Sequence, residues 1–117
     1  MTATEMATLA VAALKDKLAK DIHVIDIDAI STLGNYLIVC EAGSTTQAKA
    51  LCDSVEYHLN KKEIHPLRIE GYQGGNWILA DYGEVMVHVF TGNKHQFYNL
   101  ENLWADGTEV DLPDLEL

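Results

Sequence analysis

The strongest constraint on the fold is one amphipathic helix that lies between two strand-like segments. Residues 44–62 place apolar side chains three and four positions apart, which is the repeat of a helix with one buried face. The stripe consists of Ala48, Leu51, Cys52, Val55 and Leu59. A nearly continuous apolar run at residues 36–40 precedes this helix, and a short strand at residues 67–70 follows it. A strand, a helix and a strand in this order predict a crossover connection and at least one parallel strand pair.

Further elements are predicted on both sides of this unit. Residues 2–20 predict a helix, and a β-branched run at residues 22–27 predicts a strand. Residues 77–81 and 84–91 predict the two strands of a hairpin, and short helices are expected within residues 93–104. The apolar positions of the first helix are Met6, Ala10, Ala13, Leu14 and Leu18. Together these elements predict an α/β fold with one mixed five-stranded sheet flanked by helices.

The length and charge of the chain limit its organisation and its partners. With 117 residues, the chain is long enough for one domain that buries a core. Acidic residues accumulate after residue 104, so we expect a domain at residues 1–104 and a flexible acidic tail at residues 105–117. The chain carries 18 acidic and 8 basic residues, and its net charge is -10. Such a surface repels nucleic-acid phosphates, so we expect little nucleic-acid contact and a basic protein partner.

The two cysteines and the absence of a long apolar segment predict the compartment. Cys40 lies in an apolar strand and Cys52 on the apolar helix face, so both are predicted to be reduced core residues. No stretch of the sequence approaches the roughly 20 apolar residues of a spanning helix. We therefore expect a soluble, cytoplasmic protein that makes no membrane contact.

The predicted hairpin has two chemically different faces. Pairing about a turn at Tyr82 and Gly83 sets Trp77 opposite His88, and the core face is then formed by Ile78, Ala80, Val85, Val87 and Val89. The other face carries Trp77, Leu79, Asp81, Glu84, Met86 and His88. If this face is exposed, an apolar patch with a polar border marks a recognition surface. If a helix covers it, Trp77 is an ordinary core residue, and the residue pattern alone leaves both interpretations open.

An enzymatic alternative starts from two acidic residues in the first predicted strand. Asp26 and Asp28 are two positions apart, so both carboxylates could face the same way and hold Mg²⁺ for nucleotidyl transfer. Gly43 and Ser44 could supply a phosphate-binding turn, but Arg68 is the only arginine available for a triphosphate. The histidines show no metal-ligand spacing. We therefore assign no catalytic residue, no metal ligand and no cofactor.

Two long motifs resemble one known family. Residues 77–90 follow the pattern W-x-L-x-D-Y-G-x-x-x-V-H-x-F, and residues 97–104 follow F-Y-x-L-E-x-L-W. Both strings resemble the ribosomal silencing factor family, which is also called RsfS, Iojap or YbeB. Residues 33–39, Ser44 with Gln47, and the Glu70-Gly71 pair fit the same family in the same order.

The resemblance implies a fold, a partner and a mode of action. Members of this family have a mixed α/β sheet with a topology related to nucleotidyltransferases, but without that activity, and they are often homodimers. They bind the fourteenth protein of the large ribosomal subunit, block joining of the small subunit and so repress translation when nutrients are scarce. This agrees with the hairpin face described above, so we predict Trp77, Leu79, Asp81, Tyr82, Met86 and His88 as the partner-binding residues, with Trp77 as the anchor and Asp81 and Tyr82 offering polar contacts.

Four positions depart from the family pattern. The family usually has Asp where Asn35 stands and a basic or polar residue where Thr46 stands. It commonly has Arg at the position of His95 and Asp at the position of Asn99. These differences concern peripheral contacts, because the hairpin motif itself is intact.

Overall fold

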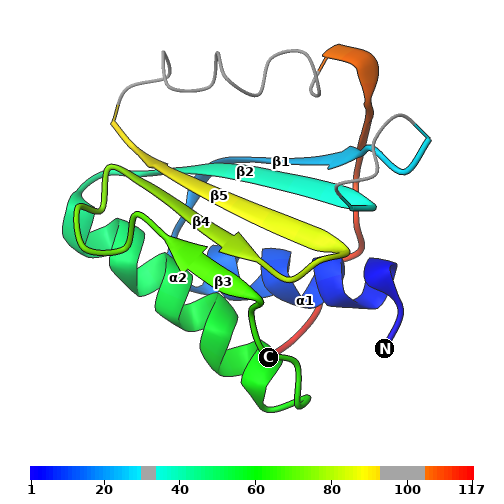
Figure 1. Cartoon of the computed structure of the whole chain (residues 1–117), viewed down its shortest axis with the longest axis horizontal. Coiled ribbons are helices and arrows are strands. Elements are labelled where there is room, and N and C mark those ends of the chain that lie inside the picture. The colour runs from blue at the N-terminus through cyan, green and yellow to red at the C-terminus, as the bar shows by residue number, and fades with distance from the viewer. Residues whose placement is uncertain (30–33, 93–104) are drawn as a thin grey trace.

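The computed structural model describes residues 1–29, 34–92 and 105–117. Within these residues, a mixed sheet of six strands carries two helices on one of its faces (Figure 1). The elements in chain order are α1 (Ala3–Asp16), β1 (Lys20–Asp26), β2 (Tyr36–Ala42), α2 (Thr45–Asn60), β3 (Arg68–Glu70), β4 (Trp77–Asp81), β5 (Val85–Thr91) and β6 (Thr108–Val110). The predicted mixed α/β sheet is confirmed, with six strands in place of five. The helices predicted within residues 93–104 lie outside the described residues.

The sheet has the strand order β3-β4-β5-β2-β1-β6. β2 and β5 run parallel at its centre, whereas every other neighbouring pair is antiparallel. The chain returns from β2 to β5 through α2, β3 and β4, so the predicted crossover and parallel pair are both present. Five of the six strands match predicted segments, and the sixth strand was not predicted.

The first helix shows how local chemistry sets a boundary. The Thr2 side chain accepts a hydrogen bond from the Glu5 backbone N–H, and the Glu5 carboxylate accepts one from the Thr2 N–H, which forms a capping box. α1 ends at Asp16, and Leu18 has a φ of 64° and is 76% exposed. The prediction that Leu18 continues the buried stripe is therefore wrong, because the chain leaves the helix through a left-handed residue before β1 begins.

The second helix matches its prediction closely. All five residues of the apolar stripe are buried, and the Ser44 hydroxyl accepts a hydrogen bond from the Gln47 backbone N–H at 3.0 Å. The Gln47 side chain also accepts from the Gly43 N–H and donates to the carbonyls of Lys17 and Leu18. This glutamine thus joins the start of α2 to the end of α1.

The core lies mainly between the helices and the sheet. α1 and α2 pack against each other and against the central strands, and their buried side chains form one cluster with Ile38, Val87 and Val89. The predicted burial of both cysteines is confirmed, and burial raises the pKa of Cys40 and of Cys52 to about 12. Neither helix of the described segments is long and apolar enough to cross a membrane.

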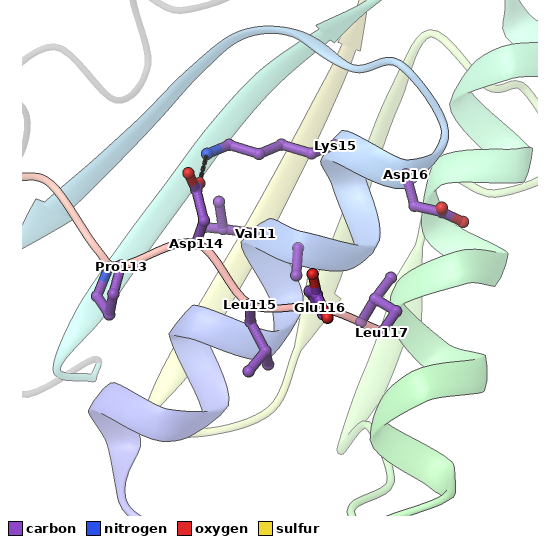
Figure 2. Close-up of a pocket in the computed structure, with 9 residues that line it drawn as sticks. Val11, Lys15, Asp16, Pro113, Asp114, Leu115, Glu116 and Leu117 are labelled. Carbon is purple, nitrogen blue, oxygen red and sulfur yellow. Dashed lines mark hydrogen bonds and ion pairs between the residues drawn. The ribbon is translucent and has the colours of Figure 1, made fainter.

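Residues 105–117 return to the domain. β6 pairs with β1 through Val24 and Val110, and Leu112 packs against the helix-side core. Figure 2 shows Lys15 of α1 reaching Asp114, and the two side chains form an ion pair of 2.8 Å. Part of the predicted acidic tail is therefore an edge strand of the sheet. The flexibility of this segment stays a prediction.

Candidate partner-binding site

The β4–β5 hairpin differs from its prediction in register. The Tyr82 N–H donates to the Val85 carbonyl at 2.9 Å, so the two turn residues are Gly83 and Glu84 rather than Tyr82 and Gly83. Gly83 has a φ of 85° in this turn, a left-handed conformation that glycine adopts without strain. Trp77 consequently pairs with Phe90 instead of His88.

This correction moves Glu84 from the predicted patch face into the turn, but it keeps the other predicted residues on their faces. The partner strand is displaced by two residues, and side chains alternate with a period of two, so each side chain keeps its face. The predicted core face packs on the helices, and all five of its residues are buried. We call the opposite side of the sheet the second face, and Phe90 joins it beside Trp77.

Five of the six predicted site residues come together on the second face. On the β2 side their neighbours in the sheet are apolar: the Asp81–Met86 pair continues into Leu37, and the Leu79–His88 pair continues into Val39. We call the five residues the hairpin patch, and they are Trp77, Leu79, Asp81, Met86 and His88. Four of them are half-buried, and His88 is 3% exposed.

Tyr82 does not belong to the hairpin patch. The structure places this residue in the cluster beneath α1 and α2, where it is 7% exposed. Burial raises the pKa of the Tyr82 hydroxyl, and the nearby Cys52 and Glu56 contribute to the same shift. Its hydroxyl oxygen has no hydrogen-bond partner within the described part of the chain. The predicted polar contact from Tyr82 to a partner stays a prediction, and it would require this buried hydroxyl to become accessible.

A hydrogen bond joins the two ring systems of the patch. The indole N–H of Trp77 donates to Nδ1 of His88 at 2.9 Å. Trp77 also stacks on Phe90, with ring centroids 5.2 Å apart and ring planes at 27°. Burial lowers the pKa of His88 to about 4, although the negative charge of Asp81 opposes this shift. At neutral pH, His88 is therefore uncharged, and Nδ1 can accept a hydrogen bond from the indole N–H.

Asp81 forms the acidic edge of the patch. Its carboxylate accepts hydrogen bonds from the Gly83 N–H at 2.8 Å and from Nε of Arg68 at 3.2 Å. Arg68 also contacts Glu70 at 3.4 Å. Sequence reasoning missed both Arg68 and Phe90 as parts of this surface. Phe90 could have been found by continuing the alternation of Met86 and His88, whereas the position of Arg68 depends on the pairing of β3 with β4.

The acidic pair proposed for magnesium is arranged differently from its prediction. Asp26 is the last residue of β1, and Asp28 lies beyond it in a turn, so the two side chains do not extend from one strand. The Asp26 carboxylate instead accepts a hydrogen bond from the Asp28 N–H at 3.1 Å. Among the residues that the structure describes, no group of three or more His, Cys, Asp or Glu could hold a metal ion.

One hollow in the described part of the molecule lies away from the hairpin patch. It encloses about 540 Å³ between α1 and the C-terminal segment, and Figure 2 shows Leu115 and Leu117 alongside the helix. Its only lysine, Lys15, is already paired with Asp114, and its other charged side chains are acidic. The described residues that line this hollow therefore do not combine an unpaired positive side chain with a negative one, as a site for a ligand with charges of both signs would need.

Two of the four departures from the family pattern can be placed. Asn35 is half-buried next to the hairpin turn, and its backbone N–H donates to the Glu84 carbonyl at 2.7 Å. Thr46 is exposed in the first turn of α2. His95, Asn99 and the second motif at residues 97–104 lie outside the described residues. The effect of these departures on partner binding stays a prediction.

The chain is similar to known proteins in both sequence and structure. A family model described as ribosomal silencing factor during starvation matches residues 1–117. Ribosomal silencing factor RsfS of Bacillus subtilis is 36% identical over 104 residues, which cover 89% of this chain and 88% of that protein. A crystal structure of a Chromobacterium violaceum protein has a TM-score of 0.84 and 32% identity, and covers 100% of this chain and 94% of its own. A Bacillus halodurans structure has a TM-score of 0.82 and 33% identity, over 92% of this chain and 98% of its own. The chain belongs to the ribosomal silencing factor family.

Proposed function

We propose that the protein binds the large ribosomal subunit through a basic ribosomal protein, the fourteenth of that subunit, and blocks joining of the small subunit. The observation that carries this proposal is the hairpin patch, which lies within the family's W-x-L-x-D-Y-G-x-x-x-V-H-x-F motif at residues 77–90. Trp77, Leu79 and Met86 are half-buried, so each keeps part of its apolar surface available to a partner. A half-buried tryptophan beside aliphatic side chains is typical of an interface anchor.

The charge of the protein supports a basic partner. The chain has a net charge of -10, Asp81 forms the acidic edge of the patch, and Glu70 of β3 and Glu84 of the hairpin turn lie next to it. Complementary charges accelerate association and orient the two proteins, while the apolar centre supplies most of the affinity. The same negative charge opposes spreading over ribosomal RNA. The ribosomal surface that fits is therefore a protein surface rather than an RNA groove.

The proposed mechanism requires no chemical turnover. A bound protein of 13.0 kDa on the joining face of the large subunit occupies space that the small subunit needs. Translation then falls in proportion to the fraction of large subunits that are occupied, and it recovers when the protein leaves. We propose that this occurs in the cytoplasm, when nutrients are limiting, and that the protein acts without a cofactor.

Sedimentation with purified ribosomal particles tests this proposal. The protein is mixed with large subunits, small subunits and joined ribosomes, and each particle is recovered through a sucrose cushion. We expect retention on large subunits only, and fewer joined ribosomes as more protein is added. Retention on small subunits, or unchanged joining at saturating occupancy, would contradict the proposal.

A matched pair of variants locates the binding surface. Trp77→Ala removes the anchor of the patch, whereas Tyr57→Ala removes a 60% exposed tyrosine on α2, which packs on the opposite side of the sheet. We expect Trp77→Ala to abolish retention and Tyr57→Ala to keep it. The reverse result would place the interface on the helices.

A second copy of the chain is the competing occupant of the patch. If a homodimer formed through the same surface, self-association and ribosome binding would exclude each other. Sedimentation velocity of the free protein and of Trp77→Ala distinguishes the two arrangements. We expect a dimer, if present, to dissociate in the variant when it uses the patch and to persist when it uses another surface.

A further inference from the structure

The patch contains one buried residue that a partner cannot reach directly. His88 is 3% exposed, whereas Trp77 beside it is half-buried. Leu79 of β4 and Val39 of β2 lie on either side of His88 in the sheet, so its imidazole is enclosed by apolar neighbours. A direct contact between His88 and another protein, as the sequence suggested, would require these neighbours to move. Its effect on binding must therefore pass through another residue.

The contact that carries such an effect is the hydrogen bond to Trp77. The indole has a single donor, and that donor is used by Nδ1 of His88 at 2.9 Å. Phe90 stacks on the indole, with ring centroids 5.2 Å apart. The indole is therefore oriented both by the hydrogen bond to His88 and by contact with the face of the Phe90 ring. A ring fixed in this way loses little conformational freedom when a partner binds it.

We propose that His88 is a positioning residue, which holds the Trp77 indole in the orientation that the ribosomal partner binds. This inference rests on the proposed function, because it assigns Trp77 the role of anchor. It also specifies the chemistry of the partner surface. Since the indole N–H is already satisfied, the partner needs no acceptor opposite it, and an apolar pocket or the stem of a lysine or arginine suffices.

The buried environment favours the protonation state that this role requires. Nδ1 accepts a hydrogen bond from the indole N–H only when Nδ1 carries no proton. The single proton of the neutral imidazole is therefore on Nε2. Nε2 has no hydrogen-bond partner in the described segments. A buried Nε2–H without a hydrogen-bond partner destabilises the fold. The presence of a histidine here despite this cost is consistent with a role in binding for the other ring nitrogen, Nδ1.

Nuclear magnetic resonance of the free, ¹⁵N-labelled full chain tests the hydrogen bond without ribosomes. The sequence has two tryptophans, so two indole N–H resonances are expected, and Trp77→Phe identifies that of Trp77. His88→Leu removes the acceptor, whereas His88→Asn retains an oxygen at a similar position. We expect the exchange of the Trp77 indole proton with solvent to accelerate by up to about tenfold in His88→Leu and less in His88→Asn. An indole resonance and exchange rate unchanged in His88→Leu would overturn the proposal.

Binding to large subunits then separates positioning from direct contact. We expect His88→Leu to weaken binding by about tenfold and His88→Asn to restore most of it. His65→Leu, which replaces an exposed histidine outside the sheet, should bind like the wild type. Equal loss in His88→Asn and His88→Leu would overturn the positioning role.

A double-mutant cycle keeps the test valid if His88→Leu fails to fold. His88→Val removes the acceptor with a smaller, β-branched side chain that suits a strand. In a Trp77→Phe background, the indole donor is absent, so His88→Val should cause little further loss of binding, whereas it should weaken binding when Trp77 is present. The same loss in both backgrounds would overturn the proposal, because it would show that His88 acts independently of the indole. If the wild-type protein is not retained on large subunits, the proposed function fails, while the resonance experiment still reports on the hydrogen bond.

Discussion

Arg68 neutralises the acidic edge of the surface that we propose for binding. Its guanidinium Nε lies 3.2 Å from Oδ2 of Asp81 across the β3–β4 pair, and the two side chains are 55% and 16% exposed. Arg68 is the only arginine in the chain, and it forms an ion pair with the Asp81 carboxylate, which a basic partner would otherwise contact. The structure thus contains an internal competitor for that partner.

Removing this competitor should strengthen binding. We expect Arg68→Gln to increase affinity for large subunits by up to about fivefold, since an exposed ion pair contributes at most about 1 kcal/mol. The free energy of unfolding should fall by less than about 1 kcal/mol for the same reason. Quantitative sedimentation and thermal melting measure the two effects. Lys62→Gln removes an equal charge from an exposed position after α2 and controls for the change in net charge. Stronger binding in both variants would indicate a general charge effect rather than competition at Asp81.

Trp77 should matter more for binding than for folding. The side chain is half-buried at the first position of β4, and it rests on Phe90 rather than within the helix-side core. We expect Trp77→Ala to weaken binding by more than about 2 kcal/mol while the far-ultraviolet circular dichroism spectrum and a cooperative thermal transition persist. An unfolded Trp77→Ala variant would identify the residue as essential core and would remove it as an anchor.

Local patterns predicted the elements of this fold better than the contacts between them. The stripe on α2 depends on residues within one helix, and all five of its members are buried. The faces of the hairpin depend only on alternation, so they remained correct when the turn shifted by one residue. By contrast, β6 has three residues and pairs with a strand more than eighty positions earlier, so nothing local predicts it. The Trp77–His88 bond likewise depends on register and rotamers, which only the folded sheet provides.

Stability should depend on pH through His88. Its pKa falls from the ordinary 6.5 to about 4 in the fold, because burial penalises the charged imidazolium. Between these values the unfolded chain binds more protons than the folded one, so stability falls as pH decreases from 6.5 towards 4. The difference between the two pKa values corresponds to about 3 kcal/mol in the free energy of unfolding. This stability is fully present above pH 6.5 and is lost as the pH falls towards 4. Chemical denaturation at a series of pH values measures this slope.

Two variants assign that slope to one residue. His88→Asn cannot titrate in this range, so we expect a flatter dependence of the unfolding free energy on pH than in the wild type. His65→Asn replaces an exposed histidine and leaves His88 in place, so it should retain the steep dependence. If His88→Asn retained the wild-type slope, other groups would be responsible for the loss of stability in acid.

Gly71 should control both the stability and the position of Trp77. Gly71 has a φ of 77°, and a Cβ atom added there would lie 2.0 Å from the Trp77 carbonyl oxygen. Gly92 has a similar φ of 78° with no atom of the described residues within 4 Å of such a Cβ, and Gly74 has neither constraint within that part of the chain. The three glycines therefore separate the cost of the left-handed backbone from the cost of the clash. We expect Gly74→Ala to be nearly neutral, Gly92→Ala to destabilise by about 1 kcal/mol, and Gly71→Ala to destabilise by about 3 kcal/mol or more.

Binding should distinguish Gly71 from Gly92 as well. Relief of the clash at Gly71 requires the start of β4 to move, and the Trp77 indole moves with it, so Gly71→Ala should weaken binding to large subunits even at temperatures where it remains folded. Gly92→Ala leaves that contact untouched and should bind normally. Denaturant titrations and sedimentation of the three variants measure both quantities. Full binding by a folded Gly71→Ala protein would mean that the partner tolerates a displaced Trp77, which would contradict the requirement for a fixed indole.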